Sequence, residues 1–436
     1  MRADRFKIYL TLLLLYVAQS VPMSFFSSAI PAIMREQGYS LEQIGLLQLV
    51  KLPWIFKLFW SPMVDRVAPT LSKLRRGIIF SELFYALTLI VISQFSLSTN
   101  FQLIAILVTI AIIFSANQDV CTDSFSIKIL QKEGFSLGAG VQSMGGFVGA
   151  LIGGGVLLIV YSYLGWQMLL YYLAIYLILS LIPLFWVSQR AVSAIEEEDD
   201  DDTTKRKDDK ELNNRVKISD FTSFFKQKHI AKHMIFLLLF NAPTMLVMAM
   251  LRPLMVDYNL SIETVGVVMG VVGTSLAAVM AMAVALIVKR KGAKIAIVLT
   301  SLLITFAMMV LFLVMVVQNP SNAMLFAAIG LVWAGHGGAT TIIYHFSMEK
   351  SREKCSAADF TFQSVIVQLS GLILSVVGSQ LAAATSYKYL FLIASLFGVI
   401  TLIYNMFYYK AVLGTQLSGT SKISLNTEFR TPQNKS

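Results

Sequence analysis

A repeat within a largely apolar sequence constrains the fold of this chain more than any other feature. Four pairs share one constant offset of 221 positions: Pro22 and Pro243, Glu42 and Glu263, Gly45 and Gly266, and Gln142-Ser143 and Gln363-Ser364. A constant offset across four landmarks predicts two copies of one structural unit. Two parallel repeats of membrane helices, with a binding site at their interface, are a known transporter architecture. The repeat therefore favours transport, whereas hydropathy alone would predict only a membrane protein.

The composition is typical of a protein with many membrane-spanning helices. The chain has 436 residues, of which 56% are hydrophobic and 14% charged, and its mean hydropathy is +0.70. A soluble core of this size would need far more polar surface to cover it. We therefore expect an all-α polytopic membrane protein with twelve helices in two six-helix halves. The expected spans are about 8–33, 42–63, 77–96, 101–127, 138–162, 167–188, 232–256, 263–288, 293–317, 322–347, 359–383 and 387–409.

Basic residues lie in alternate loops between the expected spans. They precede the first span and follow the second, fourth, eighth and tenth, whereas the opposite loops are nearly bare. Basic loops stay on the cytoplasmic side, so we expect both termini to be cytoplasmic. The formal charge of +10 reflects this topology. Because the basic residues sit in short loops between spans, we expect no nucleic-acid partner.

A charged segment separates the two expected halves. It contains the acidic run 196–202, which repels itself and cannot bury apolar area, so we expect a cytoplasmic linker. A regulatory role for this run is an open alternative. Phe221, Phe224 and Phe225 then lie on one side of a short helix expected at the membrane surface. The expected units are an N-terminal half at 1–188, the linker and interfacial helix at 189–230, a C-terminal half at 231–410 and a flexible cytoplasmic tail at 411–436.

The sequence has no pattern typical of catalysis or of a cofactor site. Cys121 and Cys355 fall in different halves near the cytoplasmic side, so we expect no disulfide. No metal-site spacing, nucleophile–His–acid pattern or phosphate loop stands out. We therefore expect a monomer that is not an enzyme and has no cofactor. Its expected partners are the lipid bilayer, a small-molecule solute and protons.

Glycines recur at four-residue spacing in the fifth expected span, at Gly145, Gly149 and Gly153. Small residues at this spacing let helices approach closely. Helix packing is the favoured interpretation, and direct contact with a solute is the alternative. Both hold if the two halves move against each other along such a seam.

Charged residues inside the second and fourth spans form the main candidate site. Intramembrane charges are costly and usually mark a pathway or a paired lock. At about 1.5 Å per residue, Lys57 lies roughly 22 Å and Asp119 roughly 27 Å from the outer ends of these two inward-running spans. Asp123 shares a helix face with Asp119 because the two are four residues apart. Two such carboxylates repel each other when ionised, and Lys57 is the natural cation between them.

Two hypotheses follow for these charges. In the first, Asp119 or Asp123 takes up and releases a proton while Lys57 changes partner. In the second, the charges form a fixed lock at a cytoplasmic gate. The gate residues would then include Arg66, Arg76 and Glu82.

Uncharged polar residues occupy corresponding places in the two halves and could line a central cavity. Two lie near the prolines of the first and seventh spans, two are repeat mates on the fifth and eleventh, one precedes Asp119, and one is a glycine-flanked histidine. These candidates are Gln19, Gln118, Gln142, Asn241, His336 and Gln363. Interhelical hydrogen bonding of each glutamine, and a packing role for the histidine, are the alternatives.

Several motifs of the first half resemble those of one transporter family. The stretch 56–66, followed by Arg75-Arg76-Gly77, is similar to the corresponding stretch of the muropeptide permease AmpG and its relatives. The stretch 117–123 resembles that family's Gln-Asp-x-x-x-Asp signature on the fourth helix, and 134–155 followed by Leu164-Gly165-Trp166 is also similar. The resemblance implies the peptide/acetyl-coenzyme A/drug transporter branch of the major facilitators, with proton-coupled import.

This resemblance also implies a cytoplasmic gate, which would comprise Asp65, Arg66, Arg75, Arg76 and Glu82. The length of 436 residues and the short outer loops favour a bacterial inner membrane as the location. The first span, over 19–26, is more like the siderophore permeases of the RhtX/FptX type, so siderophore-like and muropeptide-like solutes both stay open. A facilitator-fold receptor or sensor, and an exchanger not coupled to protons, are the alternative functions.

Overall fold

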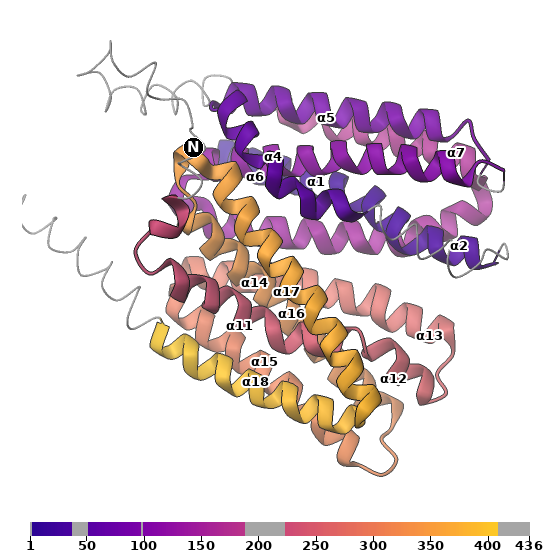
Figure 1. Cartoon of the computed structure of the whole chain (residues 1–436), viewed down its shortest axis with the longest axis vertical. Helices are drawn as coiled ribbons and strands as arrows, with labels where there is room; N and C mark the ends of the chain where they lie inside the picture. Colours follow the sequence, from indigo (N-terminus) through magenta and orange to yellow (C-terminus); the bar gives the residue numbers. More distant parts are fainter. Residues whose placement is uncertain (1, 37–50, 97–98, 188–222, 409–436) are drawn as a thin grey trace, which may run out of the picture.

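The computed structural model describes residues 2–36, 51–96, 99–187 and 223–408. Within these ranges every regular element is helical, which confirms the expected fold class. The helices form two bundles, coloured indigo to magenta and salmon to yellow, which lie one above the other in Figure 1. The acidic run 196–202, Phe221 and the tail 411–436 lie outside the described residues.

The first bundle holds the helices of the N-terminal half. Its elements are α1 (Arg2–Ser24), η1 (Phe25–Ala29), α2 (Ile30–Glu36), α4 (Leu52–Val67), α5 (Leu71–Ile92), α6 (Phe101–Leu151), η3 (Ile152–Val156), α7 (Leu157–Ser180) and η4 (Ile182–Phe185). α1 contains Pro22, which removes one backbone hydrogen bond, and continues into the π-helical segment η1.

The second bundle holds the C-terminal half, and a short 3₁₀ turn precedes it. The elements are η5 (Ser223–Lys226), α11 (Ile230–Met248), α12 (Leu251–Asp257), α13 (Ile262–Gly266), η6 (Val267–Gly273), α14 (Thr274–Lys291), α15 (Ala293–Val316), α16 (Asn322–Lys350), η7 (Glu353–Cys355), α17 (Ser356–Ala384) and α18 (Tyr387–Tyr408). Pro243 lies inside α11, as its repeat mate Pro22 lies inside α1.

Two sharp turns divide the longest apolar stretch, Phe101–Phe185. They lie at Gln131, with φ 49°, and at Gly165, with φ 69°. Glycine adopts positive φ freely, whereas a glutamine there is uncommon. Eight described stretches are long and apolar enough to span a membrane. Dividing the longest at these turns, and adding α4 and α5, reproduces the predicted number of spans; that all twelve cross the bilayer stays a prediction.

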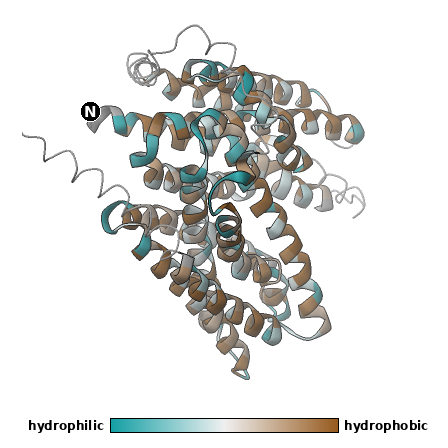
Figure 2. Cartoon of the chain, turned by 60° about the vertical axis from the view of Figure 1, so that its left-hand side comes forward, coloured by the Kyte–Doolittle hydropathy of each residue, from teal (hydrophilic) through white to brown (hydrophobic). Residues whose placement is uncertain are grey.

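Each bundle has its own hydrophobic core and an apolar outer surface. Tyr85 and Leu173 belong to a buried cluster of the first bundle, and Leu311 and Phe391 to one of the second. Large apolar side chains such as Phe407 also point outward, and Figure 2 shows hydrophobic colour along most of the helices. Lipid tails match such a surface, and helices satisfy their backbone hydrogen bonds internally, as a hydrocarbon environment requires.

The glycines at four-residue spacing hold α1 tightly against η3 and against the part of α6 that follows the turn at Gln131, here called the second limb of α6. A Cβ atom added at Gly149 would lie 2.3 Å from Ser20 Cβ, and one at Gly153 would lie 2.1 Å from the carbonyl oxygen of Val21. Both distances are far below van der Waals contact. The glycine spacing therefore serves helix packing within the N-terminal half.

We predict that Gly149→Ala destabilises the protein by about 1–3 kcal/mol, because the added methyl group overpacks the contact with α1. Gly155→Ala is the matched control, since a Cβ atom at Gly155 meets nothing within 4 Å. Thermal unfolding in detergent should show a lower Tm for the first variant and an unchanged or slightly higher one for the control. Equal Tm values for the two variants would contradict the packing role.

Candidate functional site

A buried ion pair joins α4 to α6. Lys57 Nζ contacts Asp119 Oδ2, and the two side chains are 2% and 4% exposed. Gln19 of α1 donates from Nε2 to Asp119 Oδ1 at 2.6 Å, so both carboxylate oxygens have partners. Lys57 also lies over the ring of Trp54, with Nζ 4.8 Å from the ring centroid. The contact agrees with the similar depths expected for Lys57 and Asp119, and pairing is what makes two buried charges tolerable.

Neutral groups hold Asp123, one turn further along α6. Tyr16 donates its hydroxyl to Asp123 Oδ1 at 3.0 Å, and Gln142 donates from Nε2 to the same oxygen at 2.9 Å. Asp119 and Lys57 also interact electrostatically with Asp123. The cluster thus combines two carboxylates with one lysine. Such a set of charges can accommodate one exchangeable proton.

Helix geometry explains why these residues meet. Asp119 and Asp123 share one face of α6 at i, i+4, and Tyr16 and Gln19 share one face of α1 at i, i+3. Gln142 comes from the second limb of α6, which the turn in that helix brings back beside the first limb. All the charged members belong to the N-terminal half.

A cavity of about 560 Å³ lies between the two halves. This volume is within the usual range for small-molecule sites. α1, α4 and α6 contribute lining residues from the first half, and α11, α16 and α17 from the second. The longer polar side chains that could fix a solute are Lys51, Gln142, Asn241, His336, Tyr344 and Gln368. Among the described lining residues, Lys51 is the one lysine or arginine, and no Asp or Glu is present.

The structure separates the predicted cavity residues into two groups. Gln142, Asn241 and His336 line the cavity. Gln19 instead holds Asp119. Gln118 is fully buried, and neither of its side-chain amide atoms has a hydrogen-bond partner among the described residues. The carbonyl oxygen of the Gln363 side chain pairs with His233 Nε2 at 2.7 Å, away from the cavity.

Aromatic rings surround His336 in the cavity wall. The Phe147 ring lies edge-on to the imidazole with centroids 5.5 Å apart, and the Trp333 ring does so at 6.1 Å. His336 Nδ1 is buried and has no hydrogen-bond partner among the described residues. An imidazole held this way offers one polar atom and one flat face to a solute.

Lys51, Tyr344 and Gln368 were missed by the sequence analysis. The repeat itself could have found Tyr344, because the constant offset relates Asp123 to Tyr344 and Asp119 to Thr340, and both of these line the cavity. Lys51 lies at the beginning of α4, six residues before Lys57. No comparable sequence signal marks Gln368.

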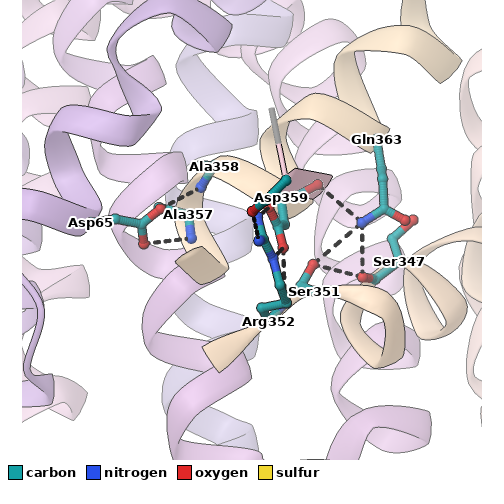
Figure 3. A network of polar contacts seen from close by, with 9 residues as sticks. Asp65, Ser347, Ser351, Arg352, Ala357, Ala358, Asp359 and Gln363 are labelled. Atoms are coloured by element: carbon teal, nitrogen blue, oxygen red, sulfur yellow. Dashed lines mark hydrogen bonds and ion pairs between the residues drawn. The ribbon is translucent and has the colours of Figure 1, made fainter. Parts of the chain in front are cut away.

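A second polar contact joins the two halves at one end of the bundles. Asp65 of α4 accepts hydrogen bonds from the backbone N–H groups of Ala357 and Ala358, at 2.9 and 2.8 Å, where α17 begins (Figure 3). Ser124 and Ser356 are hydrogen-bonded across the same boundary at 2.7 Å. A carboxylate at a helix N-terminus satisfies unpaired donors and interacts favourably with the helix dipole. Asp65 therefore fastens α4 to α17.

The first turn of α17 also holds the preceding loop. Arg352 donates from Nε to Asp359 Oδ2 at 2.7 Å and from Nη2 to Oδ1 at 2.8 Å, a bidentate pair seen in Figure 3. Arg352 also contacts Ser223 of η5. Phe224 and Phe225 of the expected interfacial helix pack on Phe362, with ring centroids 5.3 and 5.0 Å apart. The sequence analysis missed Arg352 and Asp359.

The other residues of the predicted gate do not assemble around Asp65. Arg66 and Arg76 are exposed, and Arg75 lies over the ring of Phe185 at 4.9 Å. Glu82 is fully buried and its Oε1 accepts a weak hydrogen bond from Ser180 of α7 at 3.4 Å. Six residues correspond to about 240° around a helix, so Glu82 and Arg76 face different directions on α5.

Described residues show no group of three or more His, Cys, Asp or Glu side chains that could hold a metal. Cys121 and Cys355 are both buried, and neither forms a disulfide among the described residues. The chemistry available at the site is therefore that of carboxylates, a lysine, amides, hydroxyls and an imidazole.

Known proteins resemble this chain in sequence and in fold. A model of the Major Facilitator Superfamily matches residues 12–358. The anhydromuropeptide permease of Escherichia coli (strain K12) is 29% identical over 169 residues, covering 38% of this chain and 34% of that protein, so the chain matches about a third of that relative's length. The putative transporter AmpG 3 of Rickettsia typhi is 22% identical over 423 residues, covering 90% of this chain and 94% of that protein.

A solved structure gives the same picture for the fold alone. The proton:xylose symporter XylE superimposes with a TM-score of 0.70 at 12% sequence identity. The superposition covers 94% of this chain and 96% of the symporter.

We predict that Asp65→Ala loosens the contact between α4 and α17. The change removes two charge-assisted hydrogen bonds, each worth about 1.5–3 kcal/mol. Cys355 is 3% exposed and directly precedes α17, so it reports on this contact. In a Cys121→Ala background, Asp65→Ala should raise the rate of Cys355 alkylation at least about tenfold.

Glu133→Gln is the control for that measurement. Glu133 is an exposed carboxylate whose ion pair, with Arg5 at 3.4 Å, stays within the N-terminal half. Its removal should leave Cys355 alkylation unchanged. If Asp65→Ala reacts no faster than Glu133→Gln, Asp65 does not hold the two halves together.

Proposed function

We propose that this chain, which belongs to the Major Facilitator Superfamily, imports a muropeptide-like solute together with protons. Members of this superfamily are secondary transporters that move solutes by alternating access between two halves. The observation that carries the proposal is the cavity between the halves, with a buried lysine–carboxylate cluster beside it. We place the protein in a bacterial inner membrane as a monomer, with both termini and the linker cytoplasmic, and with the halves at 1–188 and 231–410.

The residues that line the cavity favour a polar solute that carries many hydrogen-bond acceptors. Its amides can pair with peptide or acetamido groups, and the ring of Phe147 beside His336 offers a flat apolar surface. Lys51 supplies a positive charge that no described acidic residue of the lining neutralises, which favours a solute with a carboxylate. An anhydromuropeptide has these groups, and the E. coli relative is named for that solute. A siderophore-like solute is the competing possibility, because residues 19–26 of the first span are more like those of siderophore permeases.

The buried cluster supports proton coupling. In the structure Lys57 pairs with Asp119, while Asp123 relies on neutral donors. Protonation of Asp119 would remove its charge and free Lys57 to turn to Asp123, with which it already interacts electrostatically. The cluster would then be electrically neutral. A neutral cluster can move through a low-dielectric interior at a lower cost in free energy than a charged one. We therefore assign proton uptake to Asp119 and the change of partner to Lys57.

The contact at Asp65 supports a gate role. It joins α4 of one half to the beginning of α17 of the other, so the two halves cannot separate at this end without breaking it. Asp65 is also one of the residues that the family resemblance places in the cytoplasmic gate. We assign Asp65 to closure of the cytoplasmic side. Arg66 lies in the last turn of α4, and Arg75 and Arg76 lie near the beginning of α5, on either side of the adjoining loop.

We predict that proteoliposomes containing the protein accumulate a labelled anhydromuropeptide when an inward proton gradient is imposed, and that collapsing the gradient abolishes accumulation. Uptake of a siderophore in place of the anhydromuropeptide would show that the proposed solute is wrong, and it would leave the proposed proton-coupled mechanism intact. Binding without flux would favour the receptor alternative, and flux indifferent to the gradient would favour the exchanger.

A charge-balanced pair of variants tests the role of Asp119. If Asp119 carries the proton, Asp119→Asn should lose uphill accumulation and keep downhill exchange, because the amide keeps the size but cannot be protonated in the same way. The double variant with Lys57→Met leaves no unpaired lysine. We expect it to remain unable to accumulate solute. Restored accumulation in the double variant would show that Asp119 only neutralises Lys57.

A further inference from the structure

Gln142 is placed between the solute cavity and the charged cluster. It lines the cavity, is 7% exposed, and donates from Nε2 to Asp123 Oδ1 at 2.9 Å. Among the described lining residues, it is the one with a hydrogen bond to either carboxylate of the cluster. Any exchange of hydrogen bonds between a bound solute and Asp123 therefore has a direct route through this one side chain.

The orientation of the Gln142 amide depends on its bond to Asp123. Gln142 Oε1 is buried and has no hydrogen-bond partner, so no second bond among the described residues fixes the amide plane. A hydrogen bond to an ionised carboxylate is roughly twice as strong as a bond between neutral groups. The ionised state of Asp123 therefore holds the N–H groups of Gln142 toward the cluster.

Proton uptake by the cluster loosens the hold on the amide. When the cluster takes up a proton, Asp123 is either neutral itself or compensated by Lys57, and its hold on Gln142 Nε2 weakens. The amide can then turn, because no residue of the described ranges binds Oε1, and present its N–H groups to the cavity. A solute that carries hydrogen-bond acceptors gains these donors in the protonated state and competes with Asp123 for them in the ionised state.

We propose that Gln142 couples solute binding to proton binding by giving its amide N–H to Asp123 when the cluster is ionised and to an anionic, acceptor-rich solute when the cluster is protonated. This inference rests on the proposed function and specifies the solute chemistry that the coupling selects. By linkage, a proton that strengthens solute binding is itself bound more tightly when solute is present. Proton and solute would thus load together, as symport requires.

The repeat mate shows why the coupling belongs to one half. Gln363 donates from Nε2 to the carbonyl oxygens of Ser347 and Asp359, and its Oε1 pairs with His233. Both ends of this amide are therefore occupied, and Gln363 does not line the cavity. The two glutamines occupy the same position in the repeat. They differ because the side-chain amide of Gln142 can turn, as the coupling requires, whereas that of Gln363 is held at both ends.

Several titratable groups face Asp123 and bear on its pH response. They are Tyr16 of α1, Lys57 of α4, Asp119 and Cys121 of α6, and Tyr344 of α16. Ordinary pKa values for tyrosine and cysteine are about 10 and 8.5, and that of a free carboxylate on a solute is about 4. In a Cys121→Ala background, a comparison between about pH 5.5 and pH 8 therefore reports on the cluster and not on the tyrosines or the solute carboxylate.

The first test needs no solute. Glutamine side chains are labelled with ¹⁵N in the full-length protein in nanodiscs, and Gln142→Met identifies the Gln142 amide resonance. We expect this resonance to move between about pH 5.5 and pH 8 in the parent protein and to stay fixed in Asp123→Asn. A resonance that is independent of pH in the parent would overturn the inference, whatever the transported solute is.

The second test uses an anhydromuropeptide as the probe and measures its Kd at the same two pH values. The parent should bind about tenfold more tightly at the lower pH. Gln142→Met, which keeps the length of the side chain but has no N–H, should bind with nearly equal Kd at both. Gln368→Met is the control: Gln368 lines the cavity without touching the cluster, so its loss should weaken binding equally at both pH values.

The outcomes separate this inference from the proposed function. A tenfold pH effect that survives in Gln142→Met would overturn the coupling role while leaving anhydromuropeptide transport intact. If the parent binds no anhydromuropeptide at either pH, the proposed solute is wrong, and the pH response of the Gln142 resonance decides the inference. Loss of the pH effect in Gln142→Met with its retention in Gln368→Met would establish the coupling role.

Discussion

The high free energy of an unpaired charge in a low-dielectric interior governs the arrangement of this protein. Lys57 is buried, so Asp119 must lie against it, and Gln19 must satisfy the remaining carboxylate oxygen. Those contacts fix α1, α4 and α6 relative to one another. They also leave Asp123 to neutral donors, Tyr16 and Gln142. One lysine shared by two carboxylates is the imbalance on which the proposed proton coupling depends.

The two halves repeat one fold and divide its chemistry unequally. The constant offset places Thr340 and Tyr344 where the first half has Asp119 and Asp123, and these two hydroxyl residues line the cavity, whereas the two carboxylates do not. Its own polar network, built on Arg352 and Asp359, lies at the beginning of α17. The lysine–carboxylate cluster to which we assign the proton thus lies in the first half, and the second half supplies the opposing wall of the cavity. Rocking of the halves would change access to the cavity without separating the ion pair.

α17 connects the cavity to the contact between the halves. Its first backbone N–H groups bind Asp65, its first turn binds Arg352 through Asp359, and a later part of the helix lines the cavity through Gln368. A tilt of α17 would therefore alter the cavity and the Asp65 contact together. Arg352 also contacts Ser223, the residue at which the described chain resumes after residue 187. The turn η5 is therefore attached to the same helix.

The sequence alone determined the helical membrane fold and the two-fold repeat, and it predicted that Lys57 and Asp119 could meet, because hydropathy, a constant offset and a fixed rise per residue are all properties of the linear chain. It did not determine which way each helix faces. Glu82 turns toward Ser180 and not toward Arg76, and Gln363 binds His233 and not the cavity. The partners of Asp65 are backbone N–H groups, which leave no residue-type signal in a sequence. Only tertiary structure settled these points, since helix rotation and helix-end contacts follow from side-chain packing across the whole bundle.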